Sequence, residues 1–166
     1  MKTEINTQVE AENINLAKAD KDYLDVFYTE SMRPPSSYPE KLAAHLSKNF
    51  LGNSKKFVDL GCGRGDMLRA FHKIGFEVCG TDLAPSSVKH CLPHPVTIVD
   101  LEKNSVGLDN NSFDVVFSKS VIEHLHNPIP FLKNARDLLN KDGKALFMTP
   151  SWVHTGWGPF YLDHTH

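Results

Sequence analysis

Residues 57–66 (FVDLGCGRGD) limit the possible folds of this chain more than any other segment. The apolar residues Phe57, Val58 and Leu60 run into glycines at alternate positions, and a helical pattern begins at Asp66. This order predicts a buried strand that turns sharply into a helix. Glycine lets the backbone come close to a ligand, and the amides at a helix N-terminus carry partial positive charge. The sequence therefore predicts a site for an anionic or nucleotide ligand at this turn.

Strands and helices alternate through the chain after its first 37 residues. Apolar runs predict strands at 56–60, 77–81, 96–99, 113–118 and 144–149. Helical spacing predicts helices at 39–50, 66–73, 85–91 and 128–139, with a helical turn at 121–125 and a tight turn at 141–143. Short apolar strands separated by helices are typical of an α/β fold with a doubly wound, mainly parallel sheet and helices on both faces.

The predicted helices each have an apolar face, which we expect to be buried against this sheet. These faces contain Leu42, Leu46, Phe50, Met67, Leu68, Phe71, Ile74, Phe131, Leu132, Ala135, Leu138 and Leu139. Residues 33–37 (RPPSS) cannot continue a helix. We therefore expect an N-terminal arm at 1–37 and a single domain at 38–166.

Composition excludes several classes of function. The net charge is -2, and no basic stripe or polybasic segment indicates a nucleic-acid or anionic membrane partner. No apolar run is long enough to cross a bilayer, and the first residues lack the apolar core of a signal peptide, so cytoplasmic is the default expectation. Cys62, Cys79 and Cys91 lack metal-site spacing and are interpreted as free thiols.

Acidic residues follow the second and third predicted strands. Asp82 lies about twenty residues beyond the glycine turn, where a carboxylate can accept hydrogen bonds from both hydroxyls of a ribose. It can instead cap the helix predicted from Pro85. Asp100 ends the third strand at the same edge of the sheet, where it can contact the same ligand. Alternatively, it is only a carboxylate of a surface loop. These spacings favour a nucleoside-containing ligand.

Five features occur in the order of one known family. They are the glycine turn, Asp82, Asp100, the strand 113–118 followed by Glu123-His124-Leu125 (EHL), and the turn and strand at 139–148. Over residues 56–150 the chain resembles the Rossmann-like (class I) S-adenosylmethionine-dependent methyltransferases. The resemblance implies S-adenosylmethionine as cofactor and a small-molecule acceptor, with oxygen favoured over carbon or nitrogen as the atom that is methylated. The family's sheet usually ends with two further strands, so we expect this domain to lack them and to be incomplete at its C-terminus.

The resemblance also implies a set of site residues. Asp59 would face the ammonium of the cofactor, although it could instead bind amides of the glycine turn. His124 is the candidate general base, with support of its loop as the alternative. Glu123 and His124 are adjacent, so we expect only one of them to face the pocket. The implied cofactor-binding residues are Asp59, Gly61, Cys62, Gly63, Gly65, Asp82, Leu83, Asp100, Leu101 and Ser118.

Two other functions remain open on the sequence. A non-catalytic module could keep the S-adenosylmethionine site and serve as a partner subunit. A nicotinamide-dependent oxidoreductase is disfavoured, since Asp66 stands where such enzymes place a third glycine. The aromatic, histidine-rich segment 152–166 suits an acceptor pocket or lid, and Asp163, His164 and His166 are too few and too close for us to expect a metal site. The sequence does not specify the oligomeric state.

Overall fold

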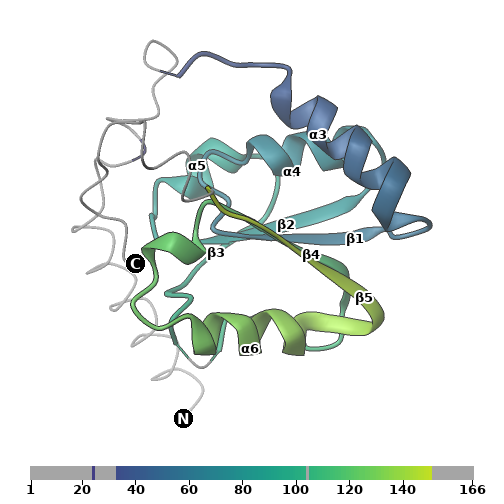
Figure 1. Cartoon of the computed structure of the whole chain (residues 1–166). Coiled ribbons are helices and arrows are strands. Elements are labelled where there is room, and N and C mark those ends of the chain that lie inside the picture. Colours follow the sequence, from purple (N-terminus) through teal and green to yellow (C-terminus); the bar gives the residue numbers. More distant parts are fainter. Residues whose placement is uncertain (1–23, 25–32, 104, 151–166) are drawn as a thin grey trace.

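The computed structural model describes Leu24 and residues 33–103 and 105–150. Within this part, five parallel strands form one sheet in the order β3-β2-β1-β4-β5 (Figure 1). The strands are β1 (Lys56–Leu60), β2 (Glu77–Asp82), β3 (Val96–Ile98), β4 (Phe113–Lys119) and β5 (Leu139–Met148). The helices are α3 (Tyr38–Leu46), the π-helix η1 (Ser47–Leu51), α4 (Asp66–Lys73), α5 (Ser87–Cys91), the 3-10 helix η2 (Ile122–His124) and α6 (Pro128–Leu138).

The order of the strands creates a crevice beside β1. The chain proceeds from β1 to β2 and β3 on one side, then returns to place β4 on the other side of β1. Asp59 is consequently in register with Gly80 of β2 and with Phe117 of β4. Ligands of open α/β sheets bind where the strand order reverses in this way, at the carboxyl ends of the strands. The predicted α/β fold with a parallel sheet is confirmed.

Each face of the sheet has its own apolar core, because successive strand residues point to opposite sides. On the face covered by α3 and α4, the rings of Phe57 and Phe71 stack with their centroids 4.0 Å apart. The opposite face is covered by α6 (Figure 1). There Val58 and Val116 belong to one buried cluster with Phe131 of that helix. Full burial of a side chain of this size contributes about 1.5–3 kcal/mol. These two cores hold the strand ends in place.

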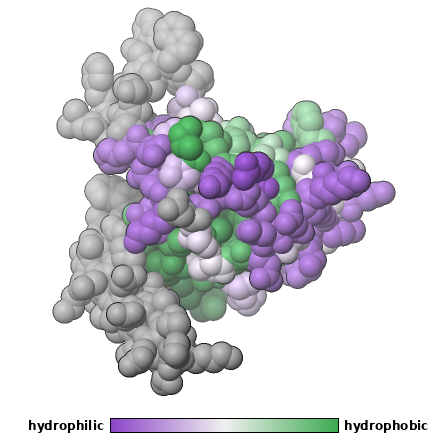
Figure 2. All heavy atoms as spheres, turned by 90° about the horizontal axis from the view of Figure 1, so that it is seen from below, coloured by the Kyte–Doolittle hydropathy of each residue, from purple (hydrophilic) through white to green (hydrophobic). Residues whose placement is uncertain are grey.

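Three apolar residues predicted to be buried are exposed instead. Phe50 is 52% exposed because α3 gives way to η1, a change of helical register that buries Leu51 in its place. Ile74 is 40% exposed since it lies beyond the end of α4. Leu132 is 39% exposed, and Asn134 on the same helix is buried, where its amide donates to the carbonyl of Lys103. Figure 2 shows the molecule from the α6 side, with apolar atoms among the hydrophilic ones on this face.

The junction between α6 and β5 also differs from the prediction. The helix ends at Leu138 and the strand begins at Leu139, whose backbone is extended with ψ 135°. The pairing with β4 then shifts from Phe113↔Leu139 to Val115↔Lys144. The turn predicted at 141–143 is therefore wrong: these residues lie inside β5, at a bulge-like irregularity where three extra residues of β5 shift its register with β4.

No helix among residues 33–103 and 105–150 is both long and apolar enough to cross a bilayer. Most of the predicted arm at 1–37 and the aromatic segment at 152–166 lie outside the described residues.

Candidate functional site

A pocket of about 790 Å³ opens at the carboxyl ends of β1, β2 and β4, where the strand order reverses. This volume lies within the range of small-molecule and cofactor sites. Most of the predicted site residues line it together. These are Asp59, Gly61, Cys62, Gly63, Asp82, Leu83, Asp100, Leu101 and His124.

Gly65 and Ser118 are absent from the lining and support the pocket from behind. A Cβ atom on Gly65 would lie 2.7 Å from the Sγ of Cys91, so glycine lets the turn pack against α5. The hydroxyl of Ser118 is buried and donates to the carbonyl of Leu60 at 2.7 Å. That bond joins β4 to β1 just below the crevice.

The glycine turn is held by hydrogen bonds within the protein. The amides of Gly61 and Cys62 both donate to the carbonyl of Thr81, at 2.8 and 2.9 Å, and that of Gly65 donates to the carbonyl of Cys62 at 2.8 Å. These amides are thus committed before any ligand arrives. The amide of Gly63 is committed as well, since it donates to Asp82, but no heavy atom lies within 4 Å of where the Cβ of this residue would be. A ligand at this turn would meet the open face of Gly63.

Asp59 is an unusual carboxylic acid. Its side chain is only 3% exposed, and its Oδ1 atom accepts no hydrogen bond from the described residues. Burial, reinforced by the negative charge of Asp82, raises the pKa of Asp59 to about 8, and the positive charge of Lys119 partly opposes this shift. A buried carboxylate without partners is costly, and a cationic ligand group within hydrogen-bond distance would relieve that cost.

Asp82 and Asp100 sit at the ends of neighbouring strands and bind nearby amides. Asp82 accepts from the amide of Gly63 at 2.7 Å and from that of Ala84 at 2.9 Å. Asp100 accepts from the amide of Glu102 at 2.9 Å. Because α5 begins only at Ser87, Asp82 does not cap that helix and stabilises the glycine turn instead.

Glu123 and His124 both belong to the pocket lining, and which of the two side chains enters the pocket stays a prediction. They lie on η2, a single short turn at the rim. Glu123 accepts a hydrogen bond from the hydroxyl of Thr149 at 3.2 Å, which ties η2 to the segment after β5. His124 is exposed at the pocket rim.

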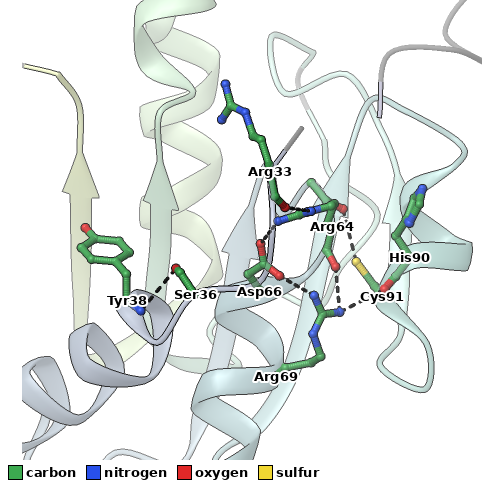
Figure 3. A network of polar contacts seen from close by, with 9 residues as sticks. Arg33, Ser36, Tyr38, Arg64, Asp66, Arg69, His90 and Cys91 are labelled. Carbon is green, nitrogen blue, oxygen red and sulfur yellow. Dashed lines mark hydrogen bonds and ion pairs between the residues drawn. The ribbon is translucent and has the colours of Figure 1, made fainter. Parts of the chain in front are cut away.

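An ion-pair network ties the segment before α3 to the glycine turn (Figure 3). Arg64 donates to the carbonyl of Arg33 at 2.9 Å and pairs with Asp66 at 3.1 Å. Asp66 also pairs with Arg69 at 2.5 Å. Sequence reasoning missed this network because it joins residues some thirty positions apart and leaves no local pattern.

Tyr38 and Lys119 are among the other pocket residues that sequence reasoning missed. Lys119 could have been noticed as the charged residue directly after the predicted strand 113–118. Tyr38 gives no such signal, since α3 reaches the pocket only through the tertiary fold.

Among residues 33–103 and 105–150, no group of three or more histidine, cysteine or acidic side chains is placed to hold a metal ion. The segment with Asp163, His164 and His166 lies outside the described residues.

Known proteins resemble the chain in sequence. A family model described as a methyltransferase domain matches residues 31–163. The ubiquinone biosynthesis O-methyltransferase of Actinobacillus pleuropneumoniae is 28% identical over 106 residues, which are 57% of this chain and 45% of that protein. The protein of the same name from Cereibacter sphaeroides is 28% identical over 126 residues, 66% of this chain and 49% of that protein. The chain spans about half the length of these curated relatives.

Solved structures share the fold. A protein of Pyrococcus horikoshii superposes with a TM-score of 0.64 at 23% identity, covering 76% of this chain and 60% of that one. A TehB-like S-adenosylmethionine-dependent methyltransferase from Corynebacterium glutamicum gives a TM-score of 0.62 at 24% identity, covering 77% and 71%.

Proposed function

The chain belongs to the methyltransferase-domain family, with the class I S-adenosylmethionine-dependent fold, and from that premise we propose that it transfers a methyl group to an oxygen atom of a small molecule. The name of the curated relatives, which are O-methyltransferases, supports oxygen as the acceptor atom. One observation carries the proposal: Asp59 lines the pocket with a buried oxygen that accepts no hydrogen bond from the described residues, and further acids stand at the adjacent strand ends.

The pocket residues fit S-adenosylmethionine in their chemistry. Asp59 would accept hydrogen bonds from the ammonium of the cofactor, and the bare backbone at Gly63 leaves room beside the turn. Asp82 would accept from the ribose hydroxyls and Asp100 would bind near the adenine, with Leu83 and Leu101 as apolar contacts for the nucleoside. When bound, the cofactor supplies an electrophilic methyl group.

The protein's contribution to transfer is mainly positioning. Holding two reactants in line lowers the barrier by about 7–11 kcal/mol, so no nucleophilic side chain is required. A hydroxyl acceptor gains from a base that removes its proton, and His124 lines the pocket on the turn after β4. We therefore assign His124 the role of base in this proposal.

Calorimetric titration of the full chain with S-adenosylmethionine and, separately, with NAD tests the cofactor. We expect saturable binding of S-adenosylmethionine and none of NAD. The reverse result would favour an oxidoreductase, and binding of neither would refute the proposal. Binding of S-adenosylmethionine without methyl transfer to any member of a panel of phenols and other hydroxyl compounds would leave a non-catalytic partner module as the better description.

His124→Ala tests the base. We expect methyl transfer to fall about 10²–10⁴-fold at unchanged S-adenosylmethionine affinity, because proton removal contributes on that scale. Replacement of the exposed His126, which is outside the pocket lining, is the matched control. Full turnover by His124→Ala would remove it as the base.

A further inference from the structure

Lys119 lies on the same face of the sheet as Phe57, Asp59 and Phe117, whose positions are described above. Alternate residues of β1 and β4 point to the α3/α4 side, and there Phe57 is followed by Asp59 while Phe117 is followed by Lys119. Asp59 and Phe117 are in register, so Lys119 lies at the end of β4, beside the carboxyl end of β1. Both strands thus change from an aromatic core residue to a charged one at the floor of the pocket.

The ammonium group of Lys119 lies in the pocket beside an aromatic ring. The residue is half-buried and lines the pocket, and its Nζ atom lies 5.7 Å from the centroid of the Tyr38 ring. That distance is within the range of a cation–π interaction. None of the ion pairs within residues 33–103 and 105–150 includes Lys119. The aromatic ring orients the charge without neutralising it.

Lys119 lies close enough to Asp59 for the lysine charge to favour the ionised form of that carboxyl, against the larger effect of burial. In the proposed function, Asp59 faces the ammonium of the cofactor. The described lining also contains the acids Asp66, Asp82, Asp100, Glu102 and Glu123 against Arg33, Arg64 and Lys119, so the pocket as a whole has no excess of positive charge. The attraction is local: an anionic oxygen in contact with the ammonium of Lys119 would be paired there, whereas a cationic group at that place would be repelled.

We infer that Lys119, oriented by Tyr38, binds an anionic oxygen group of the methyl acceptor and so selects acceptors that carry a carboxylate. This inference rests on the proposed function, because it assigns the acceptor class of the same pocket. The carboxylate is an anchor at a distance from the hydroxyl that receives the methyl group. The pocket would select acceptors with a carboxylate, because a neutral acceptor would leave the half-buried ammonium of Lys119 without an anionic partner.

Benzoate and benzamide are matched probes, since they have the same shape and differ in charge. Their dissociation constants are measured by ligand-observed NMR with the full chain saturated with S-adenosylhomocysteine, the product form of the cofactor. We expect benzoate to bind about tenfold more tightly than benzamide, the ratio for one hydrogen bond to a charged group. Lys119→Met, of similar length without the charge, is expected to abolish the preference, and Lys119→Arg to retain it.

The control variants separate charge at this site from charge elsewhere. Lys133→Met removes an exposed lysine of α6 that is outside the pocket lining, and we expect it to keep the full preference. Tyr38→Ala is expected to reduce the preference two- to fivefold through loss of the cation–π contact, while Tyr38→Phe keeps the ring and the preference.

Equal binding of the two probes, including no binding of either, would overturn the inference, as would a preference that survives in Lys119→Met. A Lys119→Met variant that weakens S-adenosylmethionine binding and leaves the benzoate preference intact would assign the lysine to the cofactor's own carboxylate instead, which also overturns it. Titration with S-adenosylmethionine is scored separately. Its failure refutes the proposed function, whereas its success with no probe discrimination refutes only the acceptor class.

Discussion

Two aspartates on neighbouring strands, Asp59 and Asp114, occupy opposite ends of the sheet and have opposite environments. Asp114 lies near the start of β4 and accepts hydrogen bonds from the amides of Lys55 and Lys56, at 2.6 and 2.9 Å, and from the side-chain amide of Asn140. These bonds, that from Lys56 foremost, hold the pKa of Asp114 below its usual value. Asp59 lies near the end of β1, and its pKa is raised to about 8, mainly by burial.

The difference shows how one fold separates stability from binding. At the amino end, Asp114 satisfies the first amides of β1 and, through Asn140, fastens the bulge in β5. At the carboxyl end, the reversal of strand order leaves a pocket in which Oδ1 of Asp59 is buried and has no hydrogen-bond partner within the described part of the chain. The first carboxylate stabilises the native state, whereas the second destabilises it until a cation binds.

Asp59→Asn gives the largest expected effect. We expect S-adenosylmethionine affinity to fall by about 1.5–3 kcal/mol, the scale of a hydrogen bond to a charged group. The free energy of unfolding at pH 8 should rise by more than about 1.4 kcal/mol, because an unpartnered buried charge is removed. Calorimetry and urea denaturation measure the two quantities. Loss of stability with unchanged affinity would make Asp59 a structural residue like Asp114.

Asp114→Ala should have the opposite effect, a loss of stability without a loss of cofactor affinity. It removes the acceptor of three hydrogen bonds at a partly solvent-exposed site, and we expect the free energy of unfolding to fall by about 2 kcal/mol. Because the pocket is at the other end of the sheet, affinity for S-adenosylmethionine should stay within twofold of wild type. A larger drop in affinity than in stability would contradict the separation of the two ends.

The pH dependence of stability should have opposite sign at the two sites. Asp59 has a folded-state pKa above its unfolded value of 3.8, so its contribution is most favourable below about pH 4 and is lost as pH rises toward 8. Asp114 has a lowered folded-state pKa, so its contribution is present above pH 4 and is lost as pH falls below that value.

Unfolding curves of wild type and Asp59→Asn should therefore diverge by more than about 1.4 kcal/mol between pH 4 and pH 8, in favour of the variant. Wild type and Asp114→Asn should instead converge below pH 4. Parallel curves over the whole range would mean that neither carboxyl has a shifted pKa.

Two glycines provide the smallest test. Gly63 at the pocket and Gly52 at the amino end have φ of 53° and 55°, and neither has a heavy atom within 4 Å of its missing Cβ. Alanine at either position should cost about 1 kcal/mol of stability through backbone strain. Only Gly63→Ala should also weaken S-adenosylmethionine binding, since its methyl group would project into the pocket. Equal affinities of the two variants would argue against a ligand beside Gly63.

Sequence reasoning succeeded where a local pattern carries the information. The strand-to-helix turn at 57–66 and the acids that follow the next two strands were enough to place Asp59, Asp82 and Asp100 around one pocket. Parallel strands align their carboxyl ends, so residues far apart in the chain converge without further information. Sequence reasoning failed where the helical register changes, as at Phe50, and where the pairing of a strand is irregular, as at 141–143.

Apolar periodicity and glycine placement act over a few residues, so they were sufficient to predict the α/β architecture, the family and the strand ends at which the site lies. The tertiary structure alone decided which carboxylate is satisfied and which is not, since that depends on amides and charges brought from distant segments. It also decided that Tyr38 lies beneath the ammonium of Lys119, and that the amides of the glycine turn are already bound. Burial and long-range contacts set these energies, and neither is written in a local pattern.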